Sequence, residues 1–80
     1  MKQIKIKLND FVITFGQKYR SERHPIWDKA HPDGYVIIQA NTVEEARAKA
    51  FETFDKYWAF IYKKRDFNPE RFPKGILGVF

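Results

Sequence analysis

The sequence predicts an α+β fold in which one helix packs on one face of an antiparallel sheet of three to four strands. The expected order is strand, strand, helix, strand, strand. Three observations predict it. Apolar and polar residues alternate near the start of the chain, as in a half-buried strand. A threonine followed by two glutamates then opens a stretch with helical apolar spacing. Nearly continuous apolar runs lie on both sides of that stretch.

The first strand is expected within residues 4–15. Its apolar residues occupy even positions from Ile4 to Leu8 and odd positions from Phe11 to Phe15, and Asn9-Asp10 marks the change. Because side chains alternate between the two faces of a strand, such a change of phase indicates a β-bulge or a tight turn. One long bulged strand and a hairpin therefore both remain open.

A long polar loop is expected over residues 17–33. It contains two His-Pro pairs, His24-Pro25 and His31-Pro32, and a residue before proline is disfavoured in a helix. Loops of this length in small domains are usually functional or disordered. Ile26 and Trp27 in its middle indicate that the loop is partly anchored.

The second strand is expected over residues 35–40, after a turn at Asp33-Gly34. Thr42 then has the pattern of an N-cap, with Glu45 placed to complete a capping box. The apolar spacing predicts a helix that runs to about Tyr57. A strand over residues 58–62, a loop over residues 63–74 and an edge strand over residues 75–80 complete the chain.

The expected strands look apolar on both faces, although one helix can cover only one face. The second face could be covered by the loop that holds Ile26 and Trp27, or by the apolar tail over residues 76–80. It could equally be covered by a second copy of the chain or by another protein. The pattern does not decide between these alternatives.

Length and composition limit the classes of function. The 80 residues are enough for a single domain over residues 1–80. There is no cysteine, which excludes disulfides and thiol chemistry. No apolar run is long enough to span a membrane, and no signal peptide is recognisable, so a cytosolic location is expected.

The net charge of +5 is unevenly distributed. Residues 1–24 carry six basic and two acidic side chains, residues 25–55 carry three and six, and residues 56–80 again carry six and two. Two basic segments around an acidic one suit an anionic partner.

Metal binding and catalysis have little support. His24, Asp28, His31 and Asp33 lie within ten residues, but their spacing matches no zinc pattern. Ser21 lies near His24 without an evident orienting group, and the acidic residues are explained by turns and by helix capping. We therefore expect no metal, no cofactor and no enzymatic activity.

Basic residues interleaved with aromatic ones form two candidate binding patches. Such residues suit phosphate contact with base stacking, and tyrosine, tryptophan and arginine are also frequent anchors of protein interfaces. Lys18 and the aromatics Phe67 and Phe72 adjoin the patches. The predicted partner-binding residues are Tyr19, Arg20, Arg23 and Trp27 in the long loop, with Lys63, Lys64 and Arg65 as the second patch.

Four segments also carry a family resemblance: ITFGQ at residues 13–17, HPDGYV at 31–36, EEAR at 44–47 and YWAFIY at 57–62. Together they resemble a group of small phage and prophage proteins of unassigned function. The likeness covers about residues 11–62, and its motifs are mostly turns and element ends. The sequence departs from the group at residues 54–57, where FDKY replaces a glycine-containing turn.

The resemblance implies a phage accessory protein made in the bacterial cytoplasm. Small proteins of this kind, including anti-CRISPR proteins, often bind host machinery. The first hypothesis is therefore a non-enzymatic inhibitor of a host defence or nucleic-acid-processing complex, with a CRISPR effector as the favoured partner. A basic chain would contact guide RNA, an acidic protein surface or the nuclease–nucleic acid junction.

Two further hypotheses stay open. The chain could bind nucleic acid directly through its basic, aromatic-interleaved surface. It could also be a structural protein whose open sheet face closes in a homodimer.

Overall fold

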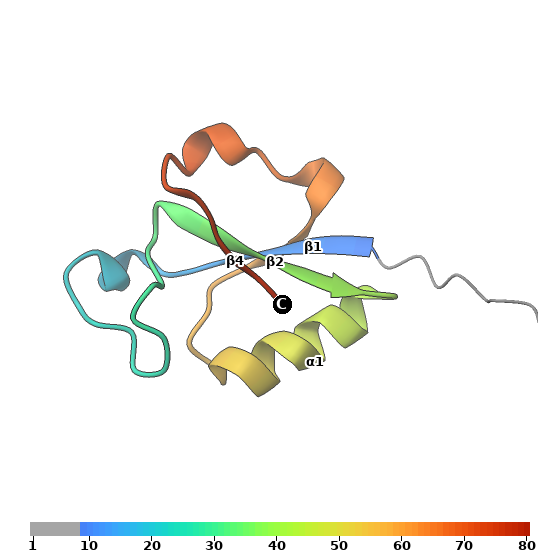
Figure 1. Cartoon of the computed structure of the whole chain (residues 1–80), viewed down its shortest axis with the longest axis horizontal. Helices are drawn as coiled ribbons and strands as arrows, with labels where there is room; N and C mark the ends of the chain where they lie inside the picture. Colours follow the sequence, from blue (N-terminus) through green and yellow to red (C-terminus); the bar gives the residue numbers. More distant parts are fainter. Residues whose placement is uncertain (1–8) are drawn as a thin grey trace, which may run out of the picture.

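A four-stranded sheet with one α-helix against one face forms the framework of the chain (Figure 1). The computed structural model describes residues 9–80. The strands are β1 (Asn9–Thr14), β2 (Gly34–Ala40), β3 (Ile61–Lys63) and β4 (Gly75–Val79), and the helix is α1 (Val43–Phe54). Short 3-10 helices span Gln17–Arg20 (η1), Lys64–Asp66 (η2) and Pro69–Arg71 (η3). The α+β class with one helix and a small sheet is confirmed, and the sheet differs from the prediction in detail.

The structure describes only part of the expected first strand. Asn9 and Asp10 belong to β1 and pair with Ala40 and Gln39, so they continue the strand. The expected strand residues from Ile4 to Leu8 lie outside the described residues.

The sheet is mixed, with strand order β3-β1-β2-β4, and the prediction of a purely antiparallel sheet is wrong for β4. Strand β1 pairs antiparallel with both β2 and β3, whereas β4 pairs parallel with β2. The reason lies in residues 64–74, which cross the sheet and return to the start of β2. There the N–H of Lys74 donates to the carbonyl of Asp33 at 2.8 Å. Because β4 begins beside the first residues of β2, it must run in the same direction.

Helix α1 begins as the sequence predicts and ends earlier. The Thr42 hydroxyl accepts the N–H of Glu45 at 3.2 Å. The Glu45 carboxylate accepts from Asn41 at 3.0 Å instead of from the cap residue itself. The helix ends at Phe54 and does not reach Tyr57, because Asp55 adopts a positive φ of 54°. The Trp58 indole N–H then donates to the carbonyl of Asp55.

The main core lies between α1 and the sheet. Odd residues of β1 and even residues of β2 face the helix, as the cross-strand pairs Phe11–Ile38 and Ile13–Val36 show. These side chains are buried against one face of α1 and against the loop between β1 and β2. The buried cluster is Phe11, Ile13, Phe15, Tyr19, Ala30, Val36, Ile38, Ala40, Ala46, Ala50 and Phe54.

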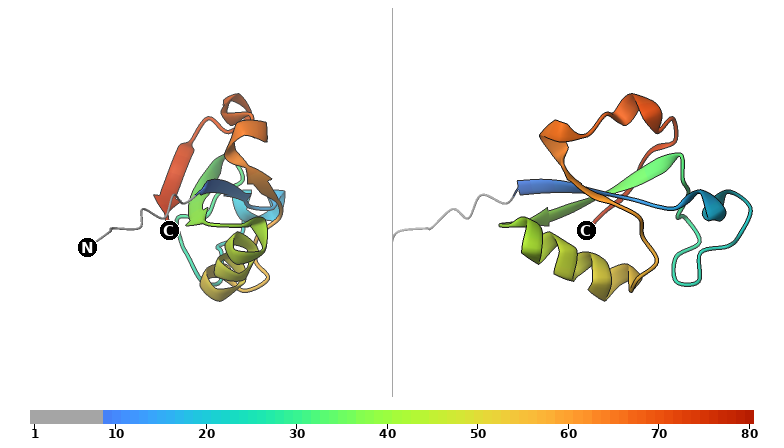
Figure 2. Two further views of the ribbon diagram at one scale, coloured as in Figure 1. Left: turned by 90° about the vertical axis from the view of Figure 1, so that its right-hand side faces the viewer. Right: turned by 180° about the vertical axis from the view of Figure 1, so that it is seen from behind.

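The opposite face of the sheet is covered in part by residues 64–74, which lie across it on the side away from α1 (Figures 1 and 2). Phe67 packs on Tyr35 with ring centroids 4.7 Å apart, and Phe72 packs on Phe67 at 4.9 Å. Val12 and Ile37 are buried on this face. The sequence left the loop of Trp27, the tail, a second copy of the chain and another protein as possible covers, and the segment that covers part of this face is none of them.

Gly34 is required by close packing between β2 and β4. A Cβ atom at this position would lie 2.6 Å from Cγ of Leu77, well inside van der Waals contact. We expect Gly34→Ala to lower the free energy of unfolding by about 1–3 kcal/mol, as other overpacking substitutions do. In a Leu77→Ala background the same change should cost much less, because the clashing atoms are gone. Denaturant unfolding of the four chains measures this coupling, and strictly additive effects would contradict it.

Candidate functional site

The aromatic residues of the long loop belong to the core. Tyr19 is 6% exposed and its ring lies 4.8 Å from that of His24. Trp27 packs against Phe54 and Phe80, with centroids 5.5 and 5.6 Å apart. The sequence predicts Tyr19 and Trp27 as surface anchors for a partner. In the structure they have a structural role, because their apolar surface packs inside the molecule. Trp27→Ala would remove core packing as well as any partner contact.

His24 fixes the shape of this loop. It is 2% exposed, and its Nδ1 accepts the backbone N–H groups of Ile26 and Trp27 at 3.1 and 3.0 Å. Because Nδ1 accepts two hydrogen bonds, Nε2 carries the proton and donates to the carbonyl of Tyr57 at 2.7 Å. Both ring nitrogens are thus occupied by backbone groups.

The residues weighed as a metal cluster are engaged elsewhere. His31 accepts the N–H of Asp33, Asp28 lies 3.5 Å from Arg23, and Asp33 binds Arg20. Within residues 9–80, no group of three or more histidine, aspartate or glutamate side chains could hold a metal ion.

Each of the two loop arginines lies beside a carboxylate. The Arg20 guanidinium forms a two-pronged pair with Asp33, at 2.7 and 2.9 Å, and also donates to Gln17. Arg23 lies 3.5 Å from Asp28 on an exposed surface. Arg20 therefore presents less positive charge to a partner than the sequence suggests, whereas the long, exposed pair of Arg23 balances its charge only in part.

The ion pair between Arg20 and Asp33 makes the stability of the fold depend on pH. The hydrogen bond from Arg20 lowers the pKa of Asp33 below its ordinary value, and the positive charge of Arg20 adds to this effect. A lowered folded-state pKa contributes stability above the unfolded-state pKa of about 3.9, and this contribution is lost as pH falls through the folded value. We expect Asp33→Asn to have a lower thermal midpoint than the natural chain at pH 6. Below pH 4 the two midpoints should lie closer together, because the natural chain then loses the contribution of the pair. Thermal unfolding at several pH values checks this, and a difference independent of pH would contradict it.

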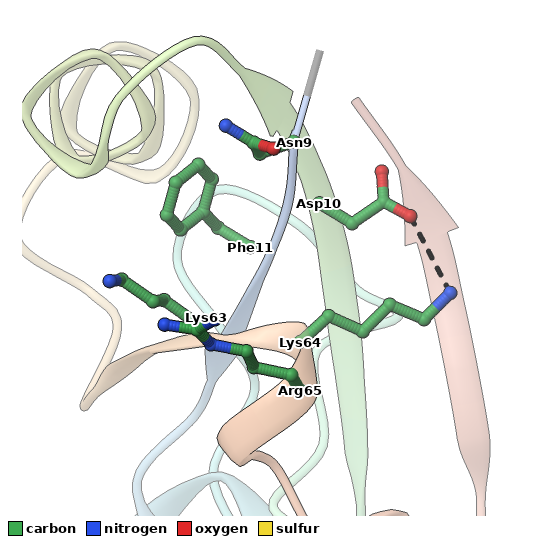
Figure 3. A pocket seen from close by; sticks show the side chains of 6 residues that line it. All are labelled: Asn9, Asp10, Phe11, Lys63, Lys64 and Arg65. Atoms are coloured by element: carbon green, nitrogen blue, oxygen red, sulfur yellow. Dashed lines mark hydrogen bonds and ion pairs between the residues drawn. The ribbon is translucent and has the colours of Figure 1, made fainter. Parts of the chain in front are cut away.

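Lys63, Lys64 and Arg65 gather at one end of the sheet, where β3 passes directly into η2. We call these three residues the basic edge. They line an open pocket together with Asn9, Asp10 and Phe11 of β1 (Figure 3). The close-up shows Lys63 and Arg65 extending together on one side of the chain, with Lys64 on the other. The edge arises because β3 pairs with β1 only over Ile61–Lys63, so η2 begins opposite the start of β1.

The charges of the basic edge are incompletely balanced. Lys64 lies 3.5 Å from the Asp10 carboxylate, which is a long and exposed ion pair. Lys63 and Arg65 make no ion pair with any carboxylate among residues 9–80. An anion with several negative charges would complement this pocket.

Two aromatic residues next to the basic edge were not among the partner-binding residues that the sequence predicts. Phe60 is 63% exposed and Tyr62 is 36% exposed, and their rings lie 6.2 Å apart. The sequence suggested that this strand is buried on both sides, but β3 is at the edge of the sheet. Conversely, Phe67 and Phe72, which adjoin the second patch in the sequence, pack on Tyr35.

Comparisons with protein-family models, with curated proteins and with solved structures found no match for this chain. Within residues 9–80, no helix combines the length and the apolar character that crossing a membrane requires.

Proposed function

We propose that this chain is a non-enzymatic binding protein that contacts nucleic acid through its basic edge. The observation that carries the proposal is the pocket whose lining brings Lys63, Lys64 and Arg65 together beside one carboxylate, that of Asp10. Its lining offers three cations, one amide and a carboxylate already turned toward Lys64. The three cations suit contact with phosphates.

Phosphate contact predicts strong dependence on salt, because binding releases counterions from the nucleic acid. Three contacts to a single strand give a slope of about −2 in a plot of log affinity against log salt concentration. Affinity should therefore fall roughly 15-fold between about 50 and 200 mM salt. Fluorescence anisotropy with a labelled oligonucleotide measures this slope. No detectable binding at low salt would overturn the proposal.

A second candidate, the inhibitor of a host complex, is favoured by strand β4. This edge strand carries no charge from Gly75 to Val79, and Ile76 and Val79 are 55% and 58% exposed. An uncharged edge can accept a strand from another protein. The phage resemblance places such a partner in the bacterial cytoplasm, as a ribonucleoprotein such as a CRISPR effector. The same edge could also pair with a second copy of the chain.

Capture of the tagged chain's partners from bacterial lysate, with and without nuclease, separates the two candidates. A host complex that survives nuclease and is lost in Val79→Lys supports the protein partner, because a lysine on the edge opposes strand addition. Partners that disappear with nuclease support the nucleic-acid proposal. Sedimentation of the pure chain tests the homodimer.

A further inference from the structure

We infer that the nucleic acid recognised by this chain is single-stranded, with bases stacking on Phe60 and Tyr62 while phosphates contact the basic edge. This inference rests on the proposed function and specifies its ligand. It starts from two large aromatic side chains that are left exposed next to the basic edge, namely Phe60 directly before β3 and Tyr62 within it.

The two rings lie on the same face of the sheet. Tyr62 is the cross-strand partner of Val12, and Thr14 exchanges backbone hydrogen bonds with Phe60 and Ala59. Phe60 directly precedes β3, and its carbonyl accepts the N–H of Thr14 at 3.0 Å, which continues the pairing with β1. Phe60 and Tyr62 are two residues apart in this extended stretch, so both project away from the helix side. Their ring centroids are 6.2 Å apart and the planes are tilted by 42°. Adjacent tilted rings of this kind can each take one base of a strand.

Burial distinguishes this pair from the other aromatics of the same face. Phe67 and Phe72 are half-buried and pack on each other and on Tyr35. Tyr62 contacts this cluster on one side, at 5.6 Å from Phe67, which holds its ring in place. Phe60 contacts only Tyr62 among the aromatic rings of residues 9–80. The internal packing thus fixes one ring and leaves open surface on both.

Cations lie on both sides of β3, but only some share the face of the rings. Lys64 turns toward Asp10, on the side away from α1, whereas Lys63 lies opposite Phe11 and extends with Arg65 on the other side of the chain (Figure 3). A single strand that stacks on the rings therefore meets Lys64 directly and reaches Lys63 and Arg65 over the edge of the sheet. Arg71 lines a pocket with Tyr62 and Phe67, and Asp66 lines the same pocket, so the aromatic side offers one further cation beside one carboxylate. Exposed rings with flanking cations are the general arrangement for single strands, in which base faces are accessible. A duplex keeps its base faces stacked internally and offers the rings no such contact.

The test combines two substitutions with two ligands. The ligands are a labelled ten-nucleotide thymidine strand and an abasic strand of equal length, which keeps the phosphates and lacks the bases. We expect the natural chain to bind the thymidine strand about 5- to 100-fold more tightly than the abasic strand, as stacking of one or more bases provides. In Phe60→Leu/Tyr62→Leu this preference should disappear, with abasic binding unchanged. Leucine keeps the side chain apolar, and Phe51→Leu, at a 50% exposed position on α1, is the matched control.

The outcomes separate this inference from the proposed function. Equal, salt-dependent binding of both strands by the natural chain would overturn base stacking and leave the basic edge as a phosphate site. Equal or tighter binding of a ten-base-pair duplex would likewise overturn the choice of a single strand. A preference that persists in the leucine variant would show that other residues contact the bases. Failure to bind any of the ligands at low salt would overturn both.

Discussion

Reversing two charges of the basic edge, in Lys63→Glu/Arg65→Glu, should weaken nucleic-acid binding about 10- to 100-fold at low salt. Each substitution removes a phosphate contact and puts a negative charge in its place. The slope of log affinity against log salt should also become shallower by about one to two. Both side chains are exposed and make no ion pair within residues 9–80, so the thermal midpoint should change little.

The matched control changes the same net charge elsewhere. Arg23→Glu/Lys29→Glu places the reversal on the exposed loop between η1 and β2, which the sequence singled out as the first candidate patch. We expect this variant to retain most of its affinity. Equal losses in the two double variants would mean that only total charge matters, and a larger loss in the loop variant would move the site to the loop.

The largest expected effect on stability comes from His24. His24→Ala should lower the free energy of unfolding by about 3–5 kcal/mol, because it leaves two N–H groups and one carbonyl without partners and opens a cavity among aromatic rings. Denaturant unfolding followed by tryptophan fluorescence measures this change.

Two conservative variants divide the role of the ring. In His24→Asn, the Oδ1 oxygen occupies the place of Nδ1 and can accept from Ile26 and Trp27. In His24→Gln, the Nε2 amide can donate to the carbonyl of Tyr57. We expect each variant to retain part of the stability that alanine loses. If all three variants lose the same amount, the hydrogen bonds contribute little and packing of the ring accounts for the effect.

Local signals in the sequence were sufficient for most of the fold. The phase of apolar residues locates β1 and β2, and Thr42 with Glu45 locates the start of α1. The direction of β4 was not predictable, because it depends on where Phe67 and Phe72 pack after the chain crosses the sheet. The end of α1 depends on a positive φ at Asp55, a residue that gives only a weak signal for it.

The sequence predicted the charged residues of the candidate site but not its aromatic residues. Lys63, Lys64 and Arg65 form a run that is visible in the sequence, and the structure gathers them around one pocket. Tyr19 and Trp27 look like interface anchors in a polar loop, but the core needs their apolar surface. The exposure of Phe60 and Tyr62 follows from the edge position of β3, which is a property of strand order.

The central claim, that the basic edge is the nucleic-acid surface, is tested most directly by NMR. A single-stranded oligonucleotide is titrated into ¹⁵N-labelled chain and amide shifts are followed residue by residue. We predict that the largest shifts fall on residues 9–11 and 60–65, with smaller ones around Arg71. Shifts confined to the loop over residues 17–33 or to β4 would contradict the claim.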